Sequence, residues 1–122
     1  MLEVLLRSPG AAAIEERLFS PGQRLHAPHL LDLEVAQVMR RRVALEQIGP
    51  KSAAMALGIL ADLPIHRHPH QFLLGRVWEL RHNFSAYDAV YVALAELLDE
   101  PLITHDKRLA NAAGHQARIE LV

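Results

Sequence analysis

The stretch between Ser85 and Ala95 constrains the fold of this chain more than any other. It is long enough for about three helical turns. Apart from Ser85 and Asp88, it contains only Ala, Val, Leu and Tyr. A helix that is apolar on all sides is buried, so the rest of the chain must build a core around it. Asp88 has only apolar or aromatic residues at i−4, i+3 and i+4, so its carboxylate needs a hydrogen bond, a cation or a metal as partner. Ser85 followed by Asp88 also fits a capping box, an ordinary structural role for this acid.

The composition is that of one globular domain spanning residues 1–122. Hydrophobic residues make up 51% of the chain and charged residues 22%, which suits a soluble protein with a substantial core. Cysteine is absent, so disulfide bonds and thiolate chemistry are excluded. The net charge of −1 argues against a broadly basic nucleic-acid-binding surface but is compatible with a local basic patch. Because no apolar run has membrane-spanning length, we expect a cytoplasmic protein with no membrane partner.

Segments typical of strands and of helices alternate along the chain. Short apolar runs predict strands at residues 25–27, 63–68, 101–104 and 118–122. Apolar residues three or four apart predict helices at residues 1–7, 11–19, 29–44, 51–61, 72–81 and 85–98, and another helix begins at 105. Leu73, Val77 and Leu80 share one side of the 72–81 helix, and we expect Trp78 to belong to the core as well. The alternation predicts an α/β fold with a largely parallel sheet flanked by helices.

Three carboxylates occupy comparable positions in this pattern. Glu34 lies on the apolar side of its helix, Asp88 begins the apolar helix, and Asp106 directly follows a short apolar strand. Asp106 taken alone is better explained as a helix N-cap. If the fold brings the three acids together, their mutual repulsion calls for a cation. Carboxylate oxygens are ligands that Mg²⁺ and Mn²⁺ prefer, and metal-assisted phosphodiester hydrolysis is the natural chemistry. Sequence spacing alone does not establish that the acids converge.

Three segments, taken in order, resemble a PIN domain of the VapC type, the toxin ribonuclease of bacterial and archaeal toxin–antitoxin pairs. They are LLDLEVA at residues 30–36, NFSAYDAVYVALA at 83–95 and LITHDKRL at 102–109. The resemblance implies that Glu34, Asp88 and Asp106 are the second, third and fourth acids of a metal site, with Thr104 as a supporting hydroxyl. It also implies RNA cleavage with Mg²⁺ or Mn²⁺, a homodimer, and inhibition by a cognate antitoxin.

The chain departs from the family pattern at its start. PIN domains open with an apolar strand that ends in an Asp ligand, and Met1 corresponds to a position inside the helix that follows. Glu3 does not replace that Asp, because it would lie a turn or more into the helix. Our hypothesis is that the natural start lies several residues upstream. A chain that begins at Met1 is expected to bind metal weakly and to cleave RNA poorly.

Basic and polar residues near the acids could contact RNA. Lys107 and Arg108 follow Asp106 directly and are candidates for phosphate contacts. Asn83, just before the apolar helix, could donate to phosphate, and a structural role in a turn is equally compatible with its position. Three histidines alternate over residues 66–70, but a zinc site would need further ligands of defined geometry, so we do not assign one.

We therefore interpret the chain as a metal-dependent endoribonuclease and the toxin of a toxin–antitoxin pair. One alternative is a catalytically inactive PIN-like module that binds antitoxin or RNA without cleaving. A second alternative is an unrelated flavodoxin-like binding domain in which all three acids are helix caps.

Overall fold

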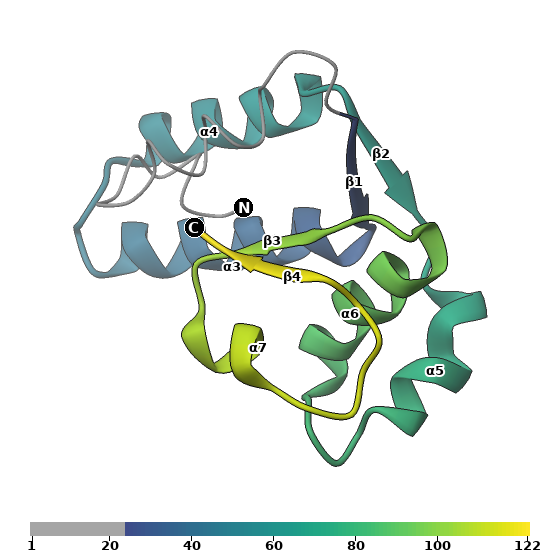
Figure 1. The fold of residues 1–122 in the computed structure, drawn as a ribbon. Coiled ribbons are helices and arrows are strands. Elements are labelled where there is room, and N and C mark those ends of the chain that lie inside the picture. Colours follow the sequence, from purple (N-terminus) through teal and green to yellow (C-terminus); the bar gives the residue numbers. More distant parts are fainter. Residues whose placement is uncertain (1–23) are drawn as a thin grey trace.

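A computed structural model of the chain describes residues 24–122. The helices expected at residues 1–7 and 11–19, and Glu3, lie outside the described residues. The elements follow one another as β1 (Leu25–Pro28), α3 (Leu30–Ala44), α4 (Pro50–Asp62), β2 (Ile65–His68), η1 (Gln71–Leu73), α5 (Leu74–Glu79), α6 (Ala86–Leu98), β3 (Leu102–Thr104), α7 (Lys107–Asn111) and β4 (Ile119–Leu121) (Figure 1). The expected order of strands and helices is confirmed over this part of the chain.

All four described strands pair in parallel, as the α/β prediction requires. β1 pairs with β2, with Leu25 opposite Ile65, and β3 pairs with β4, with Leu102 opposite Ile119. Within residues 24–122 these pairs form two separate two-stranded sheets. Figure 1 shows α3 and α4 lying side by side with β1 and β2 crossing near one end of both helices, whereas α6 and α7 lie beside β3 and β4. α6 also contacts β1 and therefore connects the two parts.

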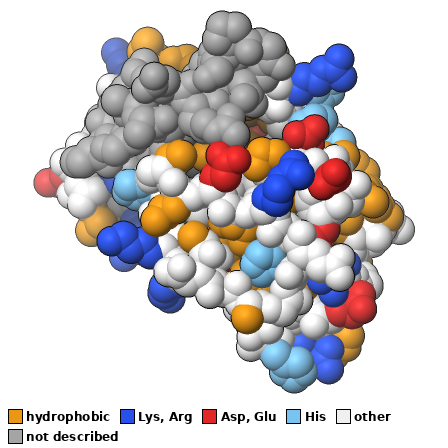
Figure 2. Space-filling model, viewed as in Figure 1, with side chains coloured by type: hydrophobic (Ala, Val, Ile, Leu, Met, Phe, Trp, Pro, Cys, Tyr) orange, Lys and Arg blue, Asp and Glu red, His pale blue; other side chains and the backbone are white. Residues whose placement is uncertain are grey.

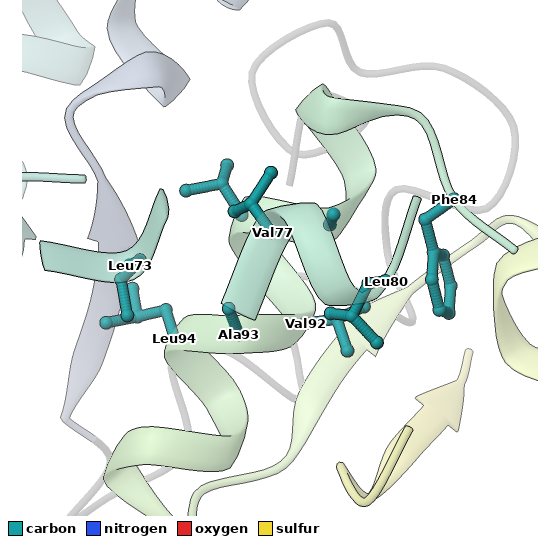
Figure 3. Close-up of a cluster of buried hydrophobic side chains, with 9 residues drawn as sticks. Leu73, Val77, Leu80, Phe84, Val92, Ala93 and Leu94 are labelled. Carbon is teal, nitrogen blue, oxygen red and sulfur yellow. The ribbon is translucent and has the colours of Figure 1, made fainter. Parts of the chain in front are cut away.

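The larger core cluster forms where α5 packs against α6 (Figure 3). Its buried residues are Leu73, Val77, Leu80, Phe84, Ala89, Val90, Val92, Ala93 and Leu94. The prediction that Leu73, Val77 and Leu80 belong to the core is confirmed. The same prediction for Trp78 is wrong, because its side chain is 67% exposed. Trp78 follows Val77 directly and is turned away from the buried side of the helix. The Arg81 guanidinium lies 4.5 Å from the centre of its ring instead.

Burial of α6 is less complete than its composition predicts. Burial begins at Ala89, whereas Tyr87 and Asp88 in the first turn are exposed, and so is Leu97 near the C-terminus. The first turn is capped as expected, since the Asp88 backbone N–H donates to Ser85 Oγ over 3.1 Å. The apolar neighbours of Asp88 along the helix therefore do not bury its carboxylate, and that part of the sequence-based prediction is wrong.

Two arginine–carboxylate pairs fix the helices that carry the predicted acids. Arg67 of β2 binds both oxygens of Asp32 on α3, with the shorter contact at 2.8 Å. Arg76 of α5 binds both oxygens of Glu96 on α6 at 2.7 and 2.8 Å, and the Gln116 backbone N–H adds a third hydrogen bond to Glu96. The guanidinium holds the pKa of the Glu96 carboxyl below its usual value. These contacts restrict the rotation of α3 and α6 relative to their neighbours.

Three imidazoles gather on one face of the β1–β2 pair. His26 Nδ1 lies 2.9 Å from His68 Nε2, and the His26 ring stacks on that of His66 with centroids 5.2 Å apart. Burial, and then the charges of His68, His66 and Arg24, lower the pKa of His26, whereas Glu100 opposes the shift. A proton is therefore bound less readily by His26 in the folded chain than in the unfolded chain.

We expect this histidine group to make folding less favourable in acid. The pKa of His26 is lower in the folded than in the unfolded chain. The free energy of unfolding that depends on neutral His26 is therefore complete above the unfolded pKa of about 6.5, and it is lost as the pH falls below that value. Between pH 7 and 5, the midpoint of urea unfolding should fall less steeply in His26→Gln than in the wild type. His82→Gln, a change at an exposed imidazole, should keep the wild-type slope. Equal slopes in all three proteins would contradict this assignment.

No helix within residues 24–122 is long and apolar enough to cross a membrane. On the face shown in Figure 2, acidic and basic side chains are interspersed with apolar ones. This mixture of charges on the visible face is in keeping with the net charge of −1.

Candidate functional site

The best-defined contact among the predicted site residues joins Glu34 to α6. Glu34 lies in the second turn of α3 and is partly buried. The Tyr91 hydroxyl of α6 donates a hydrogen bond to Glu34 Oε1 over 2.5 Å. Leu30, one turn earlier on α3, packs against the core cluster of α6. Packing and a hydrogen bond together hold the Glu34 carboxylate against the first half of α6.

Burial, a hydrogen bond and a nearby charge act on the Glu34 carboxyl. Burial raises the pKa of Glu34, the Tyr91 hydrogen bond lowers it, and the negative charge of Asp88 raises it further. Burial and the bond to Glu34 raise the pKa of Tyr91 as well, so its hydroxyl stays protonated and donates a hydrogen bond to the carboxylate. The Asp88 charge therefore disfavours the charged form of the Glu34 carboxyl.

Asp106 has a different set of contacts. Its side chain caps α7, with Oδ1 accepting from the Arg108 backbone N–H over 2.9 Å. Its own N–H donates to Oγ1 of the buried Thr104 over 3.0 Å. The N-cap role considered for this acid is confirmed. A cap engages one carboxylate oxygen of Asp106, and the other lies 3.7 Å from the Arg108 guanidinium.

The donor set of this region suits a hard cation but is incomplete. Mg²⁺ and Mn²⁺ prefer oxygen ligands such as carboxylates. A bound cation would also favour the charged form of Glu34, which burial and the Asp88 charge disfavour. Among residues 24–122, however, no cluster of three or more His, Asp or Glu side chains is arranged to hold a metal. The charge of Asp88 thus acts on Glu34, but within residues 24–122 Glu34, Asp88 and Asp106 do not form a three-ligand cluster.

The candidate RNA-contacting residues lie at the edges of α6 and α7. Lys107 and Arg108 are exposed in the first turn of α7. The exposed side chain of Asn83 lies over Gly114, where a Cβ would come within 2.3 Å of Asn83 Nδ2. Gly114 also has a φ of +87°, which favours glycine. Asn83 therefore has a packing role in the loop, in agreement with the structural alternative considered for it.

The sequence of the whole chain is similar to those of known proteins of one family. The PIN domain family matches residues 1–115. The chain belongs to the PIN-domain family. Among PIN-domain proteins it is similar to "Ribonuclease VapC1" of Mycobacterium tuberculosis, with 46% identity over 118 residues that cover 96% of this chain and 89% of the relative. "Ribonuclease VapC9" of the same organism is 41% identical over 88% of the chain and 85% of the relative. For "Ribonuclease VapC12" the identity is 39% over 99% of the chain and 92% of the relative.

Tyr91 is a residue of the candidate site that the sequence pattern does not reveal. In the sequence it is an aromatic neighbour of Asp88 at i+3, and that position indicates no role for its hydroxyl. Glu34 lies 57 residues earlier in the chain, so nothing local signals the bond. The available signal was the tyrosine hydroxyl itself, since a buried O–H requires an acceptor.

Removing the Tyr91 hydroxyl is expected to raise the pKa of Glu34. In Tyr91→Phe the carboxylate keeps its burial and its neighbour Asp88 but loses the hydrogen bond that favours its charged form. An NMR titration of the side-chain carboxyl carbons should show Glu34 titrating at higher pH than in the wild type. Tyr87→Phe, which removes an exposed hydroxyl, should leave that titration unchanged. A Glu34 titration that is the same in Tyr91→Phe and in the wild type would contradict the assigned role.

Proposed function

We propose that this PIN-domain protein is a metal-dependent endoribonuclease and the toxin of a toxin–antitoxin pair. The observation that carries the proposal is the partly buried Glu34 carboxylate, which Tyr91 holds against the helix whose first turn contains Asp88. Relatives at 39–46% identity over most of the chain are named ribonucleases. RNA is therefore the substrate class that we assign, and hydrolysis of its phosphodiester bonds is the reaction.

In this proposal Glu34, Asp88 and Asp106 hold Mg²⁺ or Mn²⁺. The chemistry that such a cation supplies when bound is activation of water and neutralisation of charge on phosphate oxygens. Tyr91 orients the Glu34 carboxylate and favours its charged form through the hydrogen bond to Oε1. The Thr104 hydroxyl oxygen accepts a hydrogen bond from the Asp106 backbone N–H and thereby positions the turn that carries this acid.

The partners follow from the same assignment. Lys107 and Arg108 are placed to contact RNA phosphates because they directly follow Asp106 and are exposed. Asn83 is a weaker candidate, since its side chain already packs over Gly114. We expect the toxin to act in the cytoplasm as a homodimer, and to be held inactive by a cognate antitoxin protein.

RNA cleavage by the purified chain tests this function. Single-stranded RNA is incubated with the protein in Mg²⁺, in Mn²⁺ and in EDTA, and Asp88→Asn prepared in the same way controls for contaminating nuclease. Cleavage that needs a metal and disappears in the variant supports the proposal. RNA binding without cleavage under any condition instead supports an inactive PIN-like module. That alternative is favoured by the incomplete metal-ligand set among residues 24–122.

A further inference from the structure

A surface hollow lies between Glu34 of α3 and the first turn of α6. Its volume is about 420 Å³, and it is lined by Leu30, Leu33, Glu34, Gln37, Val38 and Tyr87. Five of these residues come from successive turns of α3, and Tyr87 comes from the first turn of α6, next to Asp88. One wall of the hollow therefore contains a candidate catalytic carboxylate, and the opposite wall is an aromatic side chain.

The hollow combines exposed apolar surface with a few polar atoms. Tyr87 is 63% exposed and Leu33 is 71% exposed, although neither is needed to complete the core of the described chain. Most of the lining is apolar, and the amide of Gln37 and the carboxylate of Glu34 are its side-chain hydrogen-bonding groups apart from the Tyr87 hydroxyl. Small-molecule sites typically have this composition, with apolar walls and a few polar groups that fix orientation.

A nucleobase matches this chemistry better than a metal, a sugar or a peptide helix would. A base has two apolar faces that stack on aromatic rings, and an edge that both donates and accepts hydrogen bonds. Tyr87 offers a ring to one face, and Gln37 offers a donor and an acceptor to the edge. An RNA base in the hollow would lie beside Glu34, as expected of a nucleotide next to the bond that is cut.

We propose that the hollow between α3 and α6 is a nucleobase subsite, in which Tyr87 stacks on a base of single-stranded RNA and Gln37 contacts its edge. The inference rests on the proposed ribonuclease function for the identity of the ligand. It assigns to Tyr87 a role in substrate affinity and to Gln37 a role in base preference. Neither residue holds the metal.

Binding measured in EDTA separates this subsite from catalysis. The probes are fluorescein-labelled oligoribonucleotides of A, C, G or U, each about ten nucleotides long, and a matched oligonucleotide of abasic residues. Base–aromatic stacking corresponds to a loss of about 5- to 150-fold in affinity on alanine substitution. We expect Tyr87→Ala to lose affinity in this range for the tightest-binding RNA, and to bind the abasic chain as the wild type does.

Two matched variants test whether the effect belongs to the ring at this position. Tyr87→Phe keeps the ring and should bind RNA within about twofold of the wild type, since stacking supplies the affinity. Trp78→Ala removes another aromatic side chain of similar exposure, 67% against 63%, outside the hollow, and should also bind normally. Gln37→Ala should reduce the difference in affinity among the four RNAs. The melting temperature of each variant verifies that it is folded.

The outcomes distinguish the subsite from the ribonuclease proposal. Wild-type binding that is unchanged in Tyr87→Ala overturns the subsite even if the chain cleaves RNA. If Tyr87→Ala changes the mass of the protein in solution but not its affinity for RNA, the hollow is an interface between copies of the chain. That result also overturns the subsite. Wild-type protein that binds none of the four RNAs overturns it as well. Ring-dependent binding by a chain that never cleaves supports the subsite and contradicts the ribonuclease.

Discussion

Replacing Glu34 with glutamine is expected to slow RNA cleavage at least about 100-fold, because loss of a residue that only supports a metal ligand already costs 10- to 100-fold. The amide has nearly the shape of the carboxylate and can still accept from Tyr91. Its similar shape therefore keeps the packing of α3 on α6. Because the amide is neutral, the site loses the negative charge that favours a cation. Single-turnover cleavage at saturating Mg²⁺ measures the effect.

Glu79→Gln is the matched control for that experiment. Glu79 ends α5 and is exposed, so the same chemical change there should leave the cleavage rate as it is in the wild type. A rate for Glu34→Gln that equals the rate for Glu79→Gln would remove Glu34 from the catalytic machinery.

Truncating Leu80 to alanine is expected to destabilise the domain by about 2–5 kcal/mol, the usual effect of emptying a buried leucine site. Leu80 is 1% exposed and lies in the core cluster between α5 and α6 (Figure 3). Leu97→Ala changes a leucine that is 58% exposed and should stay within about 0.5 kcal/mol of the wild type. Urea unfolding of both variants measures the two free energies. A small effect at Leu80 would contradict the packing described for α5.

The order of the elements was predictable because each depends on local pattern. Leu73, Val77 and Leu80 fall on one side of a helix at spacings of four and three, and all three are buried. The same spacing places Trp78 off that side of the helix and so argues against a core position. Its large apolar side chain favours burial, and the core prediction followed the residue type. Its exposed ring, covered by Arg81, shows that helical position decided the outcome.

Long-range contacts at the candidate site were not predictable in this way. The hydrogen bond between Tyr91 and Glu34 joins residues 57 apart, and no periodicity reports such a pair. The cap formed by Asp106 was predictable, because an acid between a strand and a helix has a local partner in the backbone. The exposure of Asp88 was not predictable, because it depends on how far along α6 the neighbouring elements extend. Within α6, burial starts only at Ala89.

Strand pairing shows the same division between local and long-range information. The four short apolar runs predict strands, and parallel pairing follows from the helices between them. Which strands are neighbours depends on the packing of α6 against both β1 and β3. The separation of the described strands into two sheets was therefore outside what local pattern alone could specify.

Titration of the protein with Mn²⁺, followed by the electron paramagnetic resonance signal of the free ion, tests the central claim most directly. The account predicts that the wild-type chain binds Mn²⁺, and that Glu34→Gln and Asp88→Asn each weaken binding at least about tenfold. Asp62→Asn, a change at an exposed acid that ends α4, should bind as the wild type does. Mn²⁺ binding that is the same in all four proteins, or absent from the wild type, would contradict a shared cation site at Glu34 and Asp88.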